Sequence, residues 1–145
     1  MYQQSNKKIM KKTIIIHRIL TGLLVVFFGL GSIPDILKVD EAVVLFKHLN
    51  LPAYLLPFLG TAKLLGCLTL LLPKYPRLKE WVYAGLTFDL AGATFCALAS
   101  GDSPLTVAPM LIGFALIAGS YIYFHKRLTQ PVEIARKATN PGLAA

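Results

Sequence analysis

Four long runs of hydrophobic residues, separated by short polar segments, dominate the chain. They cover residues 14–33, 51–72, 81–99 and 105–124, so each has about the 20 residues that a helix needs to cross roughly 30 Å of hydrocarbon. None of the runs alternates polar and apolar residues as a membrane β-strand does. Short loops favour neighbours packed antiparallel. The pattern therefore predicts an all-α fold, an integral membrane four-helix up-down bundle.

The polar segments predict the remaining parts of the chain. Residues 1–13 form a basic lead, expected to be disordered and cytoplasmic, and residues 126–145 form a basic tail on the same side. The membrane domain then covers residues 14–125. Pro34 is expected to end the first helix, because proline has no amide to donate and clashes with the preceding turn.

A short amphipathic helix is predicted between the first two runs, over residues 40–50. Its apolar residues fall on one face at helical spacing, with Asp40 and Lys47 off that face. Asp40 can cap its start and Asn50 its end. Such a helix is expected to lie along the membrane surface rather than through it.

The composition supports lipid as the solvent. Hydrophobic residues make up 55% of the chain and charged residues 15%, against about 25% charged in a typical soluble domain. A net charge of +8 could instead indicate nucleic-acid binding, but the basic residues lie between and outside the apolar runs, where they determine topology. The first run could also be a signal peptide. An uncleaved helix is the simpler reading because three more runs follow.

The distribution of basic residues predicts the orientation. Eleven lysines and arginines lie in the lead, in the loop after the second run and in the tail, whereas the opposite side has only Lys38 and Lys47. This asymmetry puts both termini in the cytoplasm. The expected location is the plasma (inner) membrane, as a multi-pass protein whose first partner is the lipid bilayer and which binds no nucleic acid.

Three ionisable residues lie within the predicted spans: Arg18, Lys63 and Asp89. A charge at the centre of a span costs about 2.5–3.5 kcal/mol on insertion scales, so such residues are candidates for function. Arg18 is only five residues into its run and can reach the headgroups along its own aliphatic stem. Its other reading turns it toward the bundle or toward an anionic ligand.

Lys63 and Asp89 are predicted to meet. Lys63 lies 11 positions below Pro52, and Asp89 lies 10 positions below Ala99, so both are about 15–16 Å deep at 1.5 Å per residue. Their helices are joined by a short loop and should be neighbours. The pair either fixes the register of two helices or forms an intramembrane polar site for a proton, a quinone or a small ligand.

The candidate polar site has a lining of small residues. Gly85, Gly92 and Cys96 share the face of the third run that carries Asp89. Cys96 and Cys67 differ by 12 positions in depth, about 18 Å, so an intramolecular disulfide is not expected. Metal-ligand spacings and phosphate-binding loops do not occur. We therefore expect no catalytic residues of a known type, no metal and no firmly assigned cofactor, and whether the protein is an enzyme stays open.

The sequence resembles the DoxX-like family of small membrane proteins from about His17 to Tyr123. The motifs that carry the resemblance are Phe46–Tyr54 (FKHLNLPAY), Leu59–Gly66 (LGTAKLLG), Leu70–Pro73, Arg77–Gly85 (RLKEWVYAG), Thr87–Ala93 (TFDLAGA) and Gly101–Asp102. One departure is visible: Phe95-Cys96-Ala97 stands where family members often have a Ser-His pair.

The resemblance implies a four-helix membrane fold and a link to membrane redox complexes. Five residues of the chain match recurrent family positions: Lys63, Asp89, Gly60, Gly66 and Gly85. Gly60 and Gly66 therefore join the candidate lining. The expected function is an accessory subunit of a quinone-linked redox system, with quinone as a candidate ligand. The alternative is a small-molecule or lipid-ligand binding or transport protein. An oxidoreductase subunit or a second copy of the chain is the expected protein partner.

Overall fold

A computed structural model describes residues 2–139 of the chain, with side chains described from Met10 to Thr129. The described residues form helices and no strand. The helices are α1 (Tyr2–Leu37), α2 (Asp40–His48), α3 (Leu55–Leu71), α4 (Pro76–Ala99) and α5 (Ala108–Thr139). The lead that was expected to be disordered is helical from Tyr2, so that expectation is wrong. Residues 140–145 of the tail lie outside the described residues.

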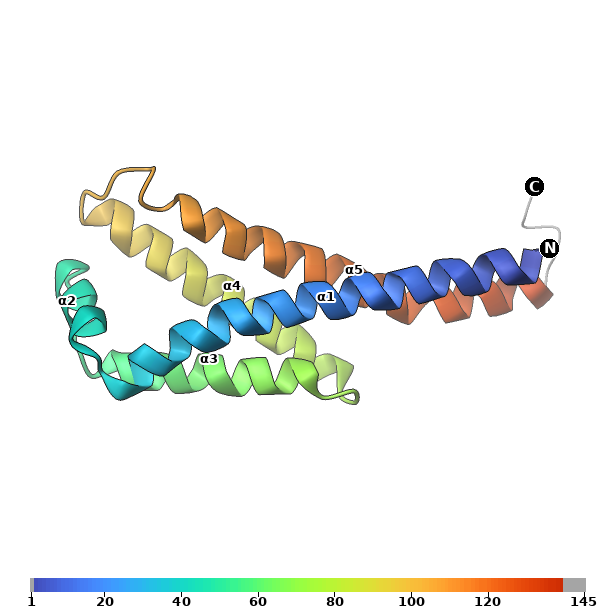
Figure 1. The fold of residues 1–145 in the computed structure, drawn as a ribbon, viewed down its shortest axis with the longest axis horizontal. Helices are drawn as coiled ribbons and strands as arrows, with labels where there is room; N and C mark the ends of the chain where they lie inside the picture. The colour runs from blue at the N-terminus through green and yellow to red at the C-terminus, as the bar shows by residue number, and fades with distance from the viewer. Residues whose placement is uncertain (1, 140–145) are drawn as a thin grey trace.

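The long helices α1, α3, α4 and α5 lie alongside one another and run in alternating directions (Figure 1). α1 packs against α3 and α5, and α4 packs against the same two helices. Helix α2 lies across the end of the molecule where α1 and α4 finish (Figure 1). The buried core between the helices contains Leu24, Phe28, Cys67, Leu70, Tyr83, Leu86, Leu90, Ile117 and Phe124.

Three helices are long and apolar enough to cross a membrane: Met10–Leu37 within α1, the whole of α4, and Ala108–Thr129 within α5. α3 is apolar but has only 17 residues, about 25 Å of helix. It begins at Leu55 rather than at residue 51, because two turns precede it. Membrane localisation therefore rests on three helices, and the fourth span stays a prediction.

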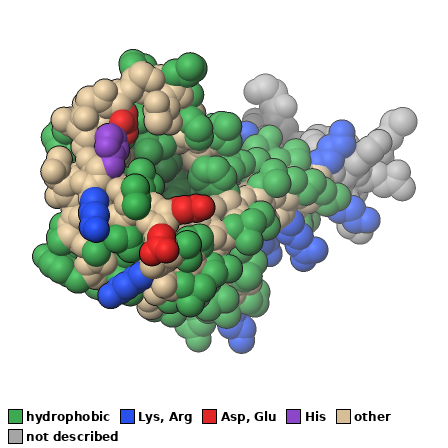
Figure 2. Space-filling view, turned by 60° about the vertical axis from the view of Figure 1, so that its left-hand side comes forward, with side chains coloured by type: hydrophobic (Ala, Val, Ile, Leu, Met, Phe, Trp, Pro, Cys, Tyr) green, Lys and Arg blue, Asp and Glu red, His purple; other side chains and the backbone are tan. Residues whose placement is uncertain are grey.

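The outer surface agrees with a lipid environment. Trp81, Phe88 and Leu105 are about four-fifths exposed, which would be costly in water for so many large apolar side chains together. Figure 2 shows acidic, basic and histidine side chains at the α2 end, further basic side chains toward the opposite end, and mainly hydrophobic side chains along the helices between them. The apolar flanks and the polar ends divide the surface as a membrane domain requires.

Three of the helices end in the same kind of turn. Lys38, Asn50 and Gly101 follow α1, α2 and α4 with φ of 51°, 55° and 87°, and their amides bond back to the last turn of each helix. This left-handed residue satisfies carbonyls that the helix leaves free. Asn50 thus terminates α2 as predicted, whereas Val39 rather than Asp40 occupies its N-cap position.

Proline does not end α1, contrary to expectation. Pro34 lies inside the helix, which continues to Leu37. The proline lacks only its own amide, and its carbonyl still accepts a bond of 3.1 Å from the amide of Val39. As a result Asp35, which the sequence pattern assigned to a loop, lies on the last turn of α1.

Candidate functional site

α1 and α3 make a close contact at Gly60. A Cβ at this position would lie 2.8 Å from the Cβ of Asp35 and 2.9 Å from the carbonyl oxygen of Ser32, distances that real side chains do not adopt. Gly60 was predicted to line the polar site. It lies buried between the two helices instead, and it sets the spacing that brings Asp35 to α3.

Lys63, one turn beyond Gly60, binds two carboxylates. Its Nζ donates a hydrogen bond of 3.0 Å to Oδ2 of Asp35 on α1 and lies 3.5 Å from Oδ2 of Asp89 on α4. The side chains are 15–20% exposed. We call Asp35, Lys63 and Asp89 the charged trio. With all three groups ionised, the trio carries one excess negative charge.

Only two of the three residues of the trio could be predicted from the sequence to meet. Counting helical rises predicted that Lys63 and Asp89 would approach each other, and the structure places them 3.5 Å apart. Asp35 was missed because α1 was expected to end at Pro34. The available signal was the apolar sequence that continues beyond the proline, with Ile36 and Leu37 directly after the acid.

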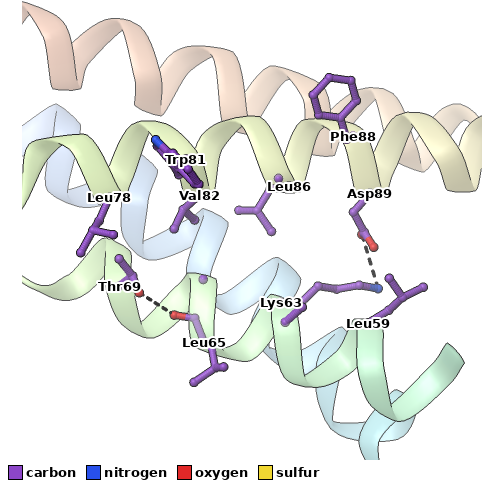
Figure 3. Close-up of a pocket in the computed structure, with 13 residues that line it drawn as sticks. Leu59, Lys63, Leu65, Thr69, Leu78, Trp81, Val82, Leu86, Phe88 and Asp89 are labelled. Carbon is purple, nitrogen blue, oxygen red and sulfur yellow. Dashed lines mark hydrogen bonds and ion pairs between the residues drawn. The ribbon is translucent and has the colours of Figure 1, made fainter.

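A groove between α3 and α4 adjoins the trio. It has a volume of about 560 Å³, and Figure 3 shows Lys63 on α3 reaching toward Asp89 on α4 at one end of it. The remaining walls are mostly apolar, and Trp81 belongs to them. The residues that line the groove are Leu59, Ala62, Lys63, Leu65, Gly66, Thr69, Leu78, Trp81, Val82, Gly85, Leu86, Phe88 and Asp89.

The other predicted site residues divide into two groups. Gly66 and Gly85 line the groove, and a Cβ on Gly66 would lie 3.2 Å from Val82, so the glycine keeps α3 and α4 close. Gly92 and Cys96 lie further along α4, outside the lining. Arg18 is exposed on α1, 17 positions from Asp35 and so about 25 Å away along the helix. The structure therefore does not bring Arg18 to the trio.

The arrangement can hold an amphiphilic molecule. A lysine ammonium has three donor hydrogens, and the two carboxylates account for two of them. The third can donate to a carbonyl or hydroxyl oxygen in the groove. The apolar walls suit a hydrocarbon tail, as in ligand pockets with a few polar groups at one end. Among residues 10–129 no cluster of His, Cys, Asp and Glu has the arrangement of a metal site.

A second polar cluster is buried near the other end of the bundle. Thr21 Oγ1 lies 3.2 Å from Nδ1 of His17 and 2.9 Å from Oγ of Ser120, which lies 2.8 Å from the hydroxyl of Tyr83. These four side chains are at most 7% exposed. They link α1, α5 and α4 in one chain of hydrogen bonds, so they fix the relative positions of the three helices.

The polar ends of the helices are also tied together. Nε2 of His48 at the end of α2 lies 2.7 Å from Oδ1 of Asp102, which follows α4. Asp102 is positioned by its own amide, which bonds to the carbonyl of Ala97 in the turn that ends α4. The contact attaches α2 to the loop between α4 and α5 and so helps to close the end nearest the trio.

A family model described as the DoxX-like family matches residues 19–120 of the chain. The matched stretch contains the whole charged trio and every residue that lines the groove. It also contains Ser120 and Tyr83 of the buried hydrogen-bond chain. No curated protein and no solved structure matches the chain.

Proposed function

Because the chain belongs to the DoxX-like family of membrane proteins, we propose that it is an accessory membrane subunit of a quinone-linked redox system. The proposal places the quinone in the groove between α3 and α4. The observation that carries it is the charged trio at one end of an otherwise apolar groove of about 560 Å³. A quinone has the matching chemistry, with carbonyl oxygens on one ring and a hydrocarbon tail.

Three features of the groove support a quinone. Lys63 has one donor hydrogen left after its two carboxylates, and a ring carbonyl can accept it. Leu86, Leu59 and Val82 offer apolar contact to a ring or tail. Trp81 belongs to the wall and its side chain is largely exposed at the surface of the protein, so we expect the groove to be open to molecules that arrive from the lipid.

Trp81 also provides the fluorescence probe for the test, since it is the only tryptophan of the chain. Purified protein in neutral detergent would be titrated with a benzoquinone that carries a ten-carbon tail, and tryptophan fluorescence recorded. Binding in the groove predicts saturable quenching. Decanol, which has the same tail without the ring, should not reproduce it.

Two variants make the titration specific. Lys63→Met should weaken the saturable phase by about tenfold or more, since a hydrogen bond to a charged group contributes about 1.5–3 kcal/mol. Lys47→Met, an exposed lysine of α2, should leave it unchanged. Equal, non-saturating quenching in all three proteins would mean collision in the micelle and would defeat the proposal.

The second candidate is a small-molecule or lipid-ligand binding or transport protein. The exposed rim of the groove favours it, because Trp81 and Phe88, which line the groove, are 80% and 78% exposed. Extraction of protein purified in mild detergent and identification of what copurifies separates the two. A quinone or an oxidoreductase subunit supports the first candidate, and a phospholipid favours the second.

We propose further that all four long helices cross the plasma (inner) membrane as an up-down bundle, with α2 on the outer surface and both termini in the cytoplasm. The eleven-to-two distribution of basic residues supports this orientation. Reporter fusions after residues 78 and 137 should report cytoplasm, and a fusion after residue 102 should report the outside. A periplasmic signal from the fusion after residue 78 would reverse the topology.

A further inference from the structure

A second groove lies between α4 and α5. It has a volume of about 490 Å³ and plays no part in the quinone proposal. Phe88 lines both grooves, and Figure 3 shows its ring on the side of α4 opposite Lys63. The residues that line the second groove are Glu80, Tyr83, Ala84, Thr87, Phe88, Phe114, Ile117, Ala118 and Tyr121. The molecule therefore offers a separate, mostly apolar space to a second ligand.

The second groove has one polar end. α4 and α5 run in opposite directions (Figure 1), so Glu80 and Tyr121 line the end at the start of α4, and Phe88 and Phe114 line the part about two turns further along. Glu80 is the one charged residue of the lining. Thr87 contributes a hydroxyl, but its Oγ1 already donates a bond of 2.7 Å to a carbonyl of its own helix. The groove thus offers a carboxylate at one end and apolar walls beyond it.

His125 lies beside this polar end with an unbonded nitrogen. Within residues 10–129 its Nε2 is the one buried side-chain nitrogen or oxygen that has no hydrogen-bond partner. The nearest charged group is Oε1 of Glu80 at 3.8 Å, which is too far for a direct hydrogen bond. The ring packs edge-on against Tyr121, with centroids 4.5 Å apart. A buried polar atom normally has a partner, so a partner for Nε2 is missing at the end of the groove.

The 3.8 Å separation suits one bridging oxygen. Two hydrogen bonds of about 2.8–2.9 Å that meet at a single oxygen at roughly 85° join atoms 3.8 Å apart. A hydroxyl has both functions that this position needs, because it can accept from an N–H on His125 and donate to the carboxylate of Glu80. An ammonium has no lone pair to accept with, and an anionic head is repelled by the carboxylate. The pair therefore selects an uncharged head that both donates and accepts.

We infer that the groove between α4 and α5 binds a neutral amphiphile with a hydroxyl head, such as a long-chain alcohol. Its oxygen lies between Glu80 and His125, and its tail lies along Phe88 and Phe114. Because Nε2 is buried, the hydroxyl enters with a shift of the Glu80 side chain, which is 48% exposed. The site gives the missing partner to the one and a donor to the other.

The test uses the small number of histidines. The chain has only His17, His48 and His125, so nitrogen NMR of the imidazole rings can follow each one, and His125→Gln identifies the signal of the third. Purified full chain with labelled histidine, in neutral detergent at constant pH, would be titrated with 1-dodecanol. The reference is dodecyl methyl ether, which keeps the tail and an acceptor oxygen but has no hydroxyl hydrogen.

The alcohol should shift the Nε2 signal of His125 in a saturable way and leave His48, on α2, unmoved. The ether should need about tenfold more to give the same shift, since it makes no bond to the charged carboxylate. A His125 signal that does not move, or that moves equally with alcohol and ether, would overturn the inference.

Two acidic residues give the first matched variants. Glu80→Gln replaces the charged acceptor with a neutral amide of the same shape, so the titration midpoint should rise by about tenfold or more. Glu41→Gln changes an exposed acid of α2 outside the groove and should leave the midpoint unchanged. An unchanged midpoint in Glu80→Gln would mean that the hydroxyl does not bind at the carboxylate.

Two alanines of α5 test the groove itself. Ala118 and Ala115 are both exposed, but only Ala118 lines the groove. Ala118→Phe should fill the space and abolish the response of His125, whereas Ala115→Phe should keep it. Equal behaviour of the two variants would contradict binding in the groove. Lys63→Met should respond to the alcohol as the native chain does, which keeps this test separate from the quinone proposal.

Discussion

Removing Lys63 should destabilise the protein far more than removing either of its acidic partners. Its Nζ lies 3.0 Å from Asp35 and 3.5 Å from Asp89. At an effective dielectric constant of about 20, each attraction is roughly 5 kcal/mol before desolvation. Lys63→Met loses both attractions and leaves two carboxylates facing each other with no cation, so the expected loss is about 3–5 kcal/mol.

Removing one carboxylate should change the free energy of unfolding much less, because favourable and unfavourable terms are lost together. Because both carboxylate oxygens approach the same Nζ, they lie at most about 6.5 Å apart, and their repulsion is at least about 2 kcal/mol at the same dielectric constant. Asp89→Asn loses one attraction, but it also removes that repulsion and the burial of one charge, which costs several kcal/mol. Lys63 and Asp35 then form a neutral pair. The expected change is within about 1 kcal/mol.

The double variant Asp35→Asn with Asp89→Asn should again lower the free energy of unfolding strongly. It leaves Lys63 without any counter-charge, which typically costs about 3–5 kcal/mol, or less where the lysine loses its proton or finds water. The two aspartate changes should therefore be strongly non-additive. The measurement is the free energy of unfolding in mixed micelles titrated with dodecyl sulfate, on the native chain and four variants: Lys63→Met, Asp35→Asn, Asp89→Asn and the double aspartate variant.

The ranking of the variants by free energy of unfolding tests whether the two carboxylates share one cation. If Asp89→Asn destabilised the protein as much as Lys63→Met, the trio would not share one cation, and the assigned geometry would be wrong. Additive effects of the two aspartate changes would lead to the same conclusion. Asn is nearly isosteric with Asp, so a loss of packing does not account for either result.

Two further predictions concern glycine packing and thiol access. Gly60→Ala should lower the free energy of unfolding by about 1–3 kcal/mol through overpacking against α1, whereas Gly29→Ala, with open space around it, should be neutral or stabilising by up to about 1 kcal/mol; equal effects would contradict the close contact. Cys67 is buried and Cys96 partly exposed, so a maleimide should label Cys96 faster, and a rapidly formed Cys67–Cys96 disulfide would contradict the helix positions.

The approach of Lys63 to Asp89 could be predicted because helical geometry is regular. α3 and α4 are consecutive and joined by a short loop, so counting rises of 1.5 Å per residue places their residues at comparable depths. The same counting could not find Asp35. Whether a helix stops at a proline or continues for one more turn depends on packing beyond it, and here Gly60 allows α1 to continue along α3.

The buried chain of hydrogen bonds through Thr21 and Ser120 was not predicted from the sequence, for another reason. A hydroxyl in a helix can bond to the carbonyl four residues earlier, as Thr61, Thr69 and Thr87 do. Thr21 and Ser120 instead bond to each other across the bundle at 2.9 Å. The sequence shows the same residue types in both cases. Only the arrangement of α1 against α5 decides which partner a hydroxyl takes.

The charge of the trio limits what the groove can bind. With all three groups ionised the trio has one excess negative charge, so it disfavours an anion and suits a neutral head with acceptor oxygens. General affinity for detergent or lipid would not depend on Lys63. Loss of the quinone response in Lys63→Met, with an unchanged response in Lys47→Met, would therefore require a site at the trio.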